Sequence, residues 1–192
     1  SARVILLEAG PRILPMFSEP QAARAVRDLE KLGVQVWVGS RVTAIDDAGV
    51  QVGAERIEAA TVLWAAGVQA SPLARHLGWP VDPQGRVRVT PDLTLPGEPR
   101  VFVAGDQALV AVDGQRALPG TAPVAMQQGI YIGQAIRRDI QGLDRVPFRF
   151  VDKGQMATIG RSRAIVEMGR LTLAGLPAWV MWLVVHIYYL TG

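Results

Sequence analysis

Residues 101–106 are Val-Phe-Val-Ala-Gly-Asp, an apolar run closed by a Gly-Asp pair. The apolar residues predict a short buried strand, and ligands of open α/β sheets lie beyond the carboxyl ends of such strands. Gly105 would let the backbone approach a ligand closely, and Asp106 would offer a carboxylate to a ribose or ribitol hydroxyl. The alternative is an ordinary turn that ends a strand, and these residues alone do not decide between the two.

The residues that follow predict a helix at 123–136, in which Gly129 and Gly133 share one face. Two glycines on one face let a helix press against another backbone or a ligand. The backbone N–H groups near residues 122–125 would form a positive pocket at the helix start, suited to the negative edge of a reduced flavin. A strand, a Gly-Asp pair, a loop and a glycine-containing helix, in this order, are typical of proteins that hold FAD.

The first residues of the chain predict a second ligand site. Residues 4–7 are apolar and predict a buried parallel strand, which Glu8 follows. An acidic residue at the end of the second Rossmann strand accepts hydrogen bonds from the adenosine ribose of NAD and would repel the 2′-phosphate of NADP. The alternative is an ordinary charged strand end. A helix is expected next, with Ser18 and Gln21 forming a capping box and Gly33 ending the helix.

Several further strands are expected. Short strands separated by turns are predicted at residues 34–38, 42–45, 49–52 and 55–57. Residues 61–67 predict another buried strand, whose last residues, Ala65, Ala66 and Gly67, leave room for a close neighbour. That neighbour is either a flavin or nicotinamide ring or a tightly packed helix. The pattern indicates half of a nucleotide-binding unit followed by a small antiparallel insertion.

The C-terminal part has a different pattern. A small β-meander is predicted from residues 146–151, 156–160 and 164–168. Residues 171–190 form an uncharged run of 20 residues, long enough to span a membrane as one helix. Pro177, however, is expected in the first turn of a new helix, and the 16 residues from there to Gly192 would reach only ~24 Å. We expect this helix to lie in one leaflet of a membrane; the alternative is a buried core helix.

Three polar side chains are further candidates for the ligand site. Gln127 and Gln128 carry amides that could orient a ligand carbonyl, although glutamines on a helix also commonly face solvent. Lys153 could reach a flavin or quinone oxygen, although a solvated lysine is the more common case. His76 and His186 are far apart in sequence and do not indicate a metal site.

Composition limits the chemistry and the partners. The chain has 192 residues, of which 49% are hydrophobic and 19% charged, so a folded core is expected. It has no cysteine, which excludes disulfides and thiolate metal sites from these residues. Residues 1–136 carry 12 basic and 13 acidic side chains, whereas residues 137–192 carry 8 and 4. This basic excess beside an apolar terminus favours an anionic membrane surface over nucleic acid, because aromatic residues are not interleaved with the basic ones.

These segments jointly resemble the C-terminal part of the type II NADH dehydrogenases, the single-subunit NADH:quinone oxidoreductases that do not pump protons. The likeness runs over essentially the whole chain, and the order and spacing of the motifs are more specific than any one motif. The motifs are Leu7-Glu-Ala-Gly-Pro-Arg-Ile-Leu-Pro15, Val62-Leu-Trp-Ala-Ala-Gly-Val68, Val101-Phe-Val-Ala-Gly-Asp106, Ala122-Pro-Val-Ala-Met-Gln-Gln-Gly129, Lys153-Gly-Gln-Met-Ala-Thr-Ile-Gly160 and the terminal His-Ile-Tyr-Tyr-Leu.

The resemblance implies an α/β fold, part of a Rossmann-like flavoprotein with two dinucleotide-binding domains, a small C-terminal β-meander and a membrane-associating helix. It implies hydride transfer from NADH to FAD and reduction of a membrane quinone, with no side chain acting as general acid or base. Many members have glutamine where this chain has proline at position 123. The residues implied in cofactor binding are Glu8, Gly67, Gly105, Asp106, Ala122, Pro123, Val124 and Lys153, and those implied to border the quinone are Met126 and Gln127.

The resemblance also divides the chain. Residues 1–58 would be the second half of an NADH-binding domain, residues 59–142 the C-terminal part of an FAD-binding domain, and residues 143–192 a membrane-associating region. Neither G-x-G-x-x-G phosphate loop of the family is present, so we expect a fragment that binds FAD poorly alone. We expect a peripheral protein on the cytoplasmic face of the inner (plasma) membrane, with a homodimer as one candidate assembly. Alternatives are a related enzyme such as a sulfide:quinone oxidoreductase and a catalytically silent membrane-docking fragment.

Overall fold

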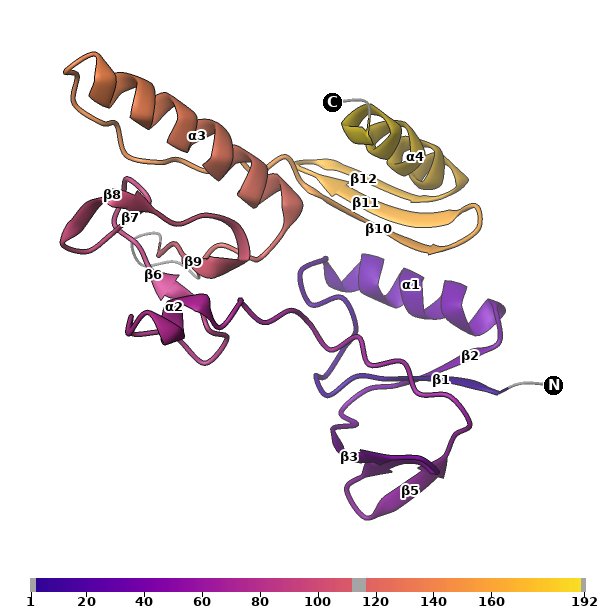
Figure 1. The fold of residues 1–192 in the computed structure, drawn as a ribbon. Coiled ribbons are helices and arrows are strands. Elements are labelled where there is room, and N and C mark those ends of the chain that lie inside the picture. The colour runs from indigo at the N-terminus through magenta and orange to yellow at the C-terminus, as the bar shows by residue number, and fades with distance from the viewer. Residues whose placement is uncertain (1–2, 112–116, 191–192) are drawn as a thin grey trace. The chain divides into compact units, whose positions relative to one another are not determined.

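The computed structural model describes residues 3–111 and 117–190, and Figure 1 traces the chain. The chain divides into two compact units. Unit 1 consists of residues 1–64 together with 153–192, and unit 2 consists of residues 65–152. Each unit has its own hydrophobic clusters.

Unit 1 begins with a parallel strand pair. Strand β1 (Val4–Leu7) pairs with β2 (Val34–Trp37), and helix α1 (Glu19–Lys31) connects them. Gly33 follows the helix with φ of 84°, a left-handed conformation that favours glycine and ends the helix as predicted. An antiparallel sheet comes next, as predicted, and consists of β3 (Val42–Asp46), β4 (Gly49–Val52) and β5 (Glu55–Glu58).

The C-terminal part of unit 1 is a three-stranded antiparallel meander covered by a helix. Within unit 1, the central strand of the meander is buried on both faces, because Ile165 packs with Ala25 of α1 and Val166 packs with Ala178 of the C-terminal helix. Figure 1 shows the meander between these two helices. The elements are β10 (Gln155–Gly160), β11 (Arg163–Met168), β12 (Leu171–Gly175) and α4 (Leu176–Leu190).

The capping box predicted at the start of α1 does not form. Ser18 is the N-cap residue, but its side chain makes no capping hydrogen bond. Its hydroxyl donates instead to the Glu167 carboxylate, which lowers the pKa of Glu167. The Gln21 amide donates to the carbonyl oxygens of Val166 and Leu173 at 3.3 and 3.0 Å. Both side chains therefore bind the meander rather than the backbone of their own helix.

Unit 2 is built from short elements around helix α3 (Ala122–Ile140). Buried Leu93 and Val110 pack with the partly buried Tyr131 and Ile132 of α3, which holds the helix onto the short strands. The other elements are α2 (Leu73–His76), β6 (Val87–Arg88), β7 (Thr94–Leu95), β8 (Glu98–Phe102), the 3₁₀ turn η1 (Gly105–Gln107) and β9 (Ala108–Leu109). β6 pairs with β9 in parallel, and β7 pairs with β8 antiparallel.

Three strands predicted from apolar runs differ in the structure. Residues 61–67 form no strand, and the Leu63 side chain is 88% exposed. Residues 146–151 also form no strand, and the third strand of the meander is β12 instead. The strand predicted at 101–106 ends at Phe102 and belongs to a two-stranded sheet, so it is not a buried central strand. In the described parts of the chain none of these runs has strands on both sides, and the side chains that do pack, Val103 and Phe148, are only partly buried against the cluster around Leu93.

Candidate functional site

The Gly-Asp pair forms a tight turn after β8. Gly105 begins η1 with φ of 66°, a conformation that favours glycine. Its N–H donates to Oε1 of Gln128 at 2.6 Å, and Gln128 is 1% exposed. The Asp106 side chain is exposed and has no hydrogen-bond partner among the described residues. Its carboxylate is therefore open to a donor from outside the chain.

The loop before α3 passes directly beside the Asp106 carboxylate. A Cβ atom built on Gly120 would lie 2.8 Å from Asp106 Oδ1, and one built on Gly105 would lie 3.6 Å from the Cβ of Ala125. The structure therefore brings the Gly-Asp turn and the first turn of α3 together within unit 2.

The start of α3 offers fewer free backbone N–H groups than the sequence predicts. Pro123 has no N–H, and the N–H groups of Val124 and Ala125 both donate to the Thr121 carbonyl at 3.1 Å. The Ala122 N–H has no acceptor among the described residues. The expected pocket of several amides is therefore a single free donor, reinforced by the positive end of the helix dipole.

Met126 and Gln127, which are predicted to border a quinone, have different surroundings. The Met126 side chain is 47% exposed. The Gln127 amide bonds the Val151 backbone twice, because Nε2 donates to the carbonyl and Oε1 accepts from the N–H, each at 3.0 Å. Both ends of this amide are engaged, so a contact between Gln127 and a quinone stays a prediction.

The glycine face of α3 is open. Cβ atoms built on Gly129 and Gly133 would meet no atom within 4 Å. On the same helix, Ile130 and Ile140 are 62% and 82% exposed. Among the described residues, nothing presses against the two glycines, and a ligand or backbone at this face stays a prediction.

The other residues predicted to bind a cofactor are divided between the two units. In unit 1, Glu8 follows β1, and its Oε1 accepts a hydrogen bond from the Gly10 N–H at 2.6 Å. Lys153, also in unit 1, is exposed just before β10. In unit 2, Gly67 has φ of 100°, and a Cβ atom there would meet nothing within 4 Å. A cofactor contact at Glu8, Lys153 or Gly67 stays a prediction.

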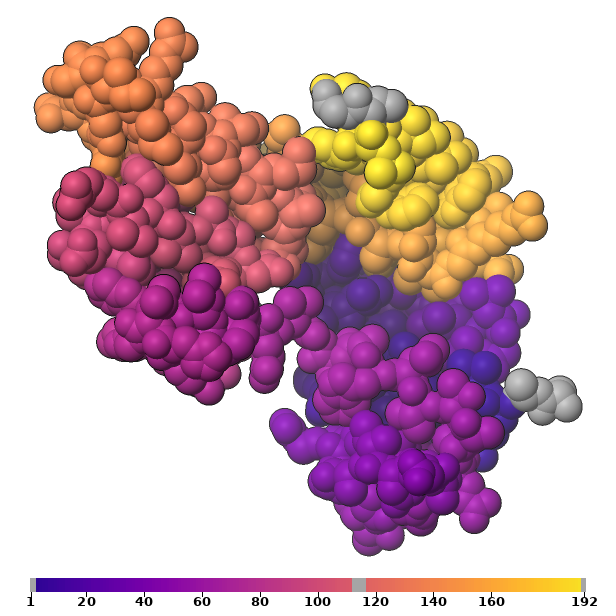
Figure 2. All heavy atoms as spheres, in the orientation of Figure 1, coloured from indigo at the N-terminus to yellow at the C-terminus, as the bar shows by residue number. Residues whose placement is uncertain are grey.

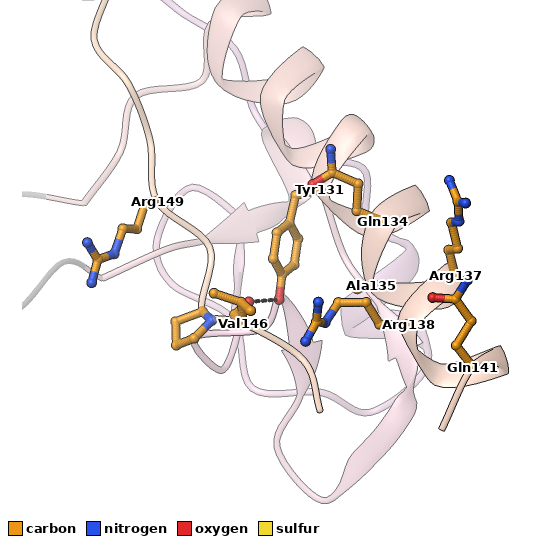
Figure 3. Close-up of a pocket in the computed structure, with 9 residues that line it drawn as sticks. Tyr131, Gln134, Ala135, Arg137, Arg138, Gln141, Val146 and Arg149 are labelled. Atoms are coloured by element: carbon orange, nitrogen blue, oxygen red, sulfur yellow. Dashed lines mark hydrogen bonds between the residues drawn. The ribbon is translucent and has the colours of Figure 1, made fainter. Parts of the chain in front are cut away.

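A groove of about 560 Å³ runs along the second half of α3, where the helix meets residues 146–149. The Tyr131 hydroxyl donates to the Val146 carbonyl at 2.7 Å inside this groove (Figure 3). Arginine side chains line it, but the guanidinium groups of Arg137 and Arg149 point in different directions (Figure 3). Because these charges do not converge, and the groove lies at the end of α3 away from Asp106, we do not place the cofactor site there.

Arg145 ties together the chain around β8. Its guanidinium pairs with Asp92 and Asp139, each at 2.7 Å, and Cζ lies 4.6 Å from the centre of the Phe102 ring. The hydrogen bond from Arg145 lowers the pKa of Asp139. Burial acts to raise the pKa of Asp92, but hydrogen bonds from two threonine hydroxyls and Arg145 outweigh it and lower that pKa. This network cannot be predicted from the sequence, because Asp92 and Arg145 are 53 residues apart and leave no local pattern.

The chain is similar to a known protein family and to curated relatives. The family described as pyridine nucleotide-disulphide oxidoreductase matches residues 1–129. The type II NADH:quinone oxidoreductase Ndh of Mycobacterium tuberculosis is 42% identical over the whole chain. The type II NADH:quinone oxidoreductase of Staphylococcus aureus is 34% identical over 93% of the chain. These relatives confirm the resemblance to type II NADH dehydrogenases.

Solved structures share the fold. NDH2 from Plasmodium falciparum in complex with NADH superposes on 96% of the chain with a TM-score of 0.85 at 15% identity, and the chain covers 54% of it. The water-forming NADH oxidase from Lactobacillus brevis bound to NADH matches 87% of the chain with a TM-score of 0.68 at 21% identity, and the chain covers 37% of it. The chain spans 43% of the M. tuberculosis relative and 46% of the S. aureus relative, which is less than half of either.

Proposed function

The chain belongs to the pyridine nucleotide-disulphide oxidoreductase family, and on this basis we propose that it forms part of a type II NADH:quinone oxidoreductase. Such an enzyme would bind FAD and NADH and reduce a membrane quinone. The relatives of that name support the proposal, because they resemble the chain over nearly all of its length. Within the chain, residues 1–58 would belong to the NADH-binding domain, residues 59–142 to the FAD-binding domain and residues 143–192 to the membrane-associating region.

The observation that carries the proposal is the open Asp106 carboxylate beside the first turn of α3. This carboxylate is exposed and lies against Gly120, where a side chain would intrude. A sugar hydroxyl can donate to a carboxylate, and the free N–H of Ala122 can donate to a ring carbonyl. These residues therefore fit FAD: Asp106 would hold the ribitol, and the backbone of residues 122–124, including Pro123 and Val124, would face the isoalloxazine ring.

The chain's own residues would bind and orient the reactants. When bound, FAD would supply the hydride and electron chemistry. Glu8 would accept hydrogen bonds from the NADH ribose, because the Gly10 N–H holds one of its oxygens and leaves the other available. Gly67 and Lys153 would line the cofactor site, and Met126 with Gln127 would border the quinone. No side chain is assigned as general acid or base.

We also propose that α4 contacts a membrane surface. Leu176, Val180, Val184 and Ile187 recur at helical spacing and are 47–61% exposed, whereas Ala178 on the other face is buried. Figure 2 shows α4, in yellow, on the outer side of the meander. Among the described residues, no helix combines the length and the apolar character needed to cross a bilayer. An exposed apolar stripe of this kind can lie in the interface of a membrane.

A peripheral position on the cytoplasmic face of the inner membrane, and a homodimer, belong to the same proposal. The test of the membrane contact is flotation with anionic liposomes. Val184→Asp is expected to abolish flotation, because it places a charge in the apolar stripe, whereas Thr43→Asp on exposed β3 is the matched control and should float normally. Normal flotation of Val184→Asp would refute the role of α4.

The test of the enzymatic proposal is the flavin content and the NADH:quinone reductase activity of the purified protein that contains this chain. We expect flavin absorbance and quinone-dependent NADH oxidation in the unmodified protein. Asp106→Ala should lose FAD and activity together, whereas Asp47→Ala, at an exposed position of unit 1, should keep both. A flavin-free protein without activity would contradict the proposed function.

A further inference from the structure

We propose that Gln128 and Gly120 are positioning residues that set the place of the Asp106 carboxylate. Gln128 fixes the backbone of the Gly-Asp turn, and Gly120 leaves the space that the carboxylate occupies. The inference rests on the proposed function, in which Asp106 holds the FAD ribitol. Both residues act through Asp106.

Gln128 is a buried polar residue on the inner face of α3. It is 1% exposed, and its buried neighbours along the helix, Val124 and Ala135, are apolar. A buried amide is unfavourable unless it forms hydrogen bonds, so a glutamine in this position indicates a specific partner. That partner is the Gly105 N–H, 2.6 Å from Gln128 Oε1.

The hydrogen bond acts on the residue immediately before Asp106. Gly105 has φ of 66°, so the backbone turns sharply just before the carboxylate. An apolar side chain at position 128 would leave the Gly105 N–H without its acceptor, which is unfavourable for a partly buried donor. Loss of this bond would release the Gly-Asp turn from α3, and Asp106 would move with it.

Gly120 acts on the carboxylate directly. A methyl group at this position would lie 2.8 Å from Asp106 Oδ1, closer than Cβ atoms approach other atoms in proteins. Gly120 does not have a positive φ, so its backbone conformation is one that alanine can adopt. The atom that would clash is the end of a side chain. Alanine would therefore displace the Asp106 carboxylate and leave the fold intact.

The experiment compares FAD affinity with thermal stability in single variants of the protein that contains this chain. FAD is titrated into flavin-stripped protein and followed by fluorescence, and Tm is measured without FAD. For Gly120→Ala we expect the Kd to rise about tenfold, as for loss of one hydrogen bond to a charged group, with Tm unchanged. For Gln128→Leu we expect a similar rise in Kd and a lower Tm. Gln128→Met keeps the length of the side chain but removes the amide acceptor, and it should bind FAD as poorly as Gln128→Leu.

The matched control for the glycine substitution is Gly160→Ala. A Cβ atom there would also lie 2.8 Å from the end of a side chain, Cδ1 of Leu32, but in unit 1. This variant should bind FAD with the unmodified Kd. If Gln128→Leu does not fold, the FAD affinity of Gly120→Ala alone shows whether the position of the Asp106 carboxylate matters.

Asp106→Ala separates failure of the inference from failure of the proposed function. If Asp106→Ala leaves the FAD Kd unchanged, the proposed function is wrong and the inference falls with it. If Asp106→Ala weakens FAD binding but Gly120→Ala and Gln128→Leu do not, the inference alone is wrong. A Gln128→Met variant that binds FAD with the unmodified Kd would refute the role of the Gly105 hydrogen bond.

Discussion

The runs Ala164-Ile-Val166, within β11, and Val101-Phe-Val103, which begins in β8 and extends one residue beyond it, are similarly apolar but differ in burial. All three residues of the β11 run are 0% exposed, whereas Val101 is 43% exposed. β11 pairs with a strand on each side and lies between α1 and α4, whereas β8 pairs only with β7 among the described strands. The number of neighbours around a strand, rather than the hydrophobicity of its sequence, therefore determines whether it belongs to a core.

The polar groups near the two strands differ as well: those near β11 bond within the chain, whereas those beyond β8 are available to a ligand. Near β11, polar side chains such as Glu167 and Gln21 bond to other parts of the chain. Beyond β8, the Asp106 carboxylate and the Ala122 N–H have no partners among the described residues. Substitutions near β11 should therefore change stability, and substitutions beyond β8 should change binding.

The largest effect that tests this contrast is expected from Ile165→Ala. We expect the free energy of unfolding to fall by about 2–5 kcal/mol, because the substitution leaves a cavity beside α1. Val101→Ala should change it by less than about 1 kcal/mol, since that side chain already contacts water. Urea denaturation measures both. Equal effects would show that a partner covers β8 in the folded protein.

An intermediate effect is expected at Arg145, which joins β8 to the rest of unit 2. Its partners Asp92 and Asp139 have pKa values lowered from 3.8 in the folded protein. A carboxyl with a lowered pKa stabilises the fold above its ordinary pKa, and this contribution disappears as the pH falls through the lowered value. We therefore expect Tm to fall from about pH 4 downward, and to fall less steeply in Arg145→Gln.

Circular dichroism during heating, repeated across the acid range, measures this effect. At neutral pH, Arg145→Gln should melt at a lower temperature than the unmodified protein, because both ion pairs are lost. Arg88→Gln, at an exposed position of β6, is the control and should reproduce the original pH profile. If Arg145→Gln also left the profile unchanged, the two ion pairs would contribute no net stability to the region around β8.

The smallest effect is expected at Gly133, and it tests whether the glycine face of α3 is exposed to solvent in the folded protein. Gly133→Ala should raise the free energy of unfolding by about 0.5–1 kcal/mol, because alanine is the better helix former and its methyl group meets no atom. Chemical denaturation measures the change. A destabilised variant would show that a partner or another backbone packs on the glycine face.

Much of the regular structure could be predicted because its signals are local. The spacing of Ala22, Ala25 and Leu29 and the glycine at position 33 predict α1, and Pro177 correctly predicts the start of α4. The burial of strands could not be predicted in the same way, because apolar runs alone do not show how many strands flank them. Residues 61–67 and 146–151 were apolar enough for strands but have no strand partners among the described residues.

The candidate site was only partly visible in the sequence. Asp106 and the start of α3 could be identified from the order of motifs, and the structure places them side by side. The residues that hold them could not be identified. Gln128 bonds to Gly105, which is 23 residues away, and nothing in the sequence distinguishes it from other glutamines on a helix. The missing N–H of Pro123 can be read from the sequence, but the loss of the Val124 and Ala125 donors to the Thr121 carbonyl depends on where the helix begins.

Unit 1 joins segments that are far apart in the sequence, since Ser18 and Glu167 bond to each other across 149 residues. A ribosome adds roughly 5–20 residues per second, so roughly 7–30 s would pass between the synthesis of α1 and the synthesis of β11. During that interval the apolar face of α1 has no meander to cover it. Nascent chains would depend on chaperones at this stage, and products truncated before residue 163 should be the most prone to aggregate.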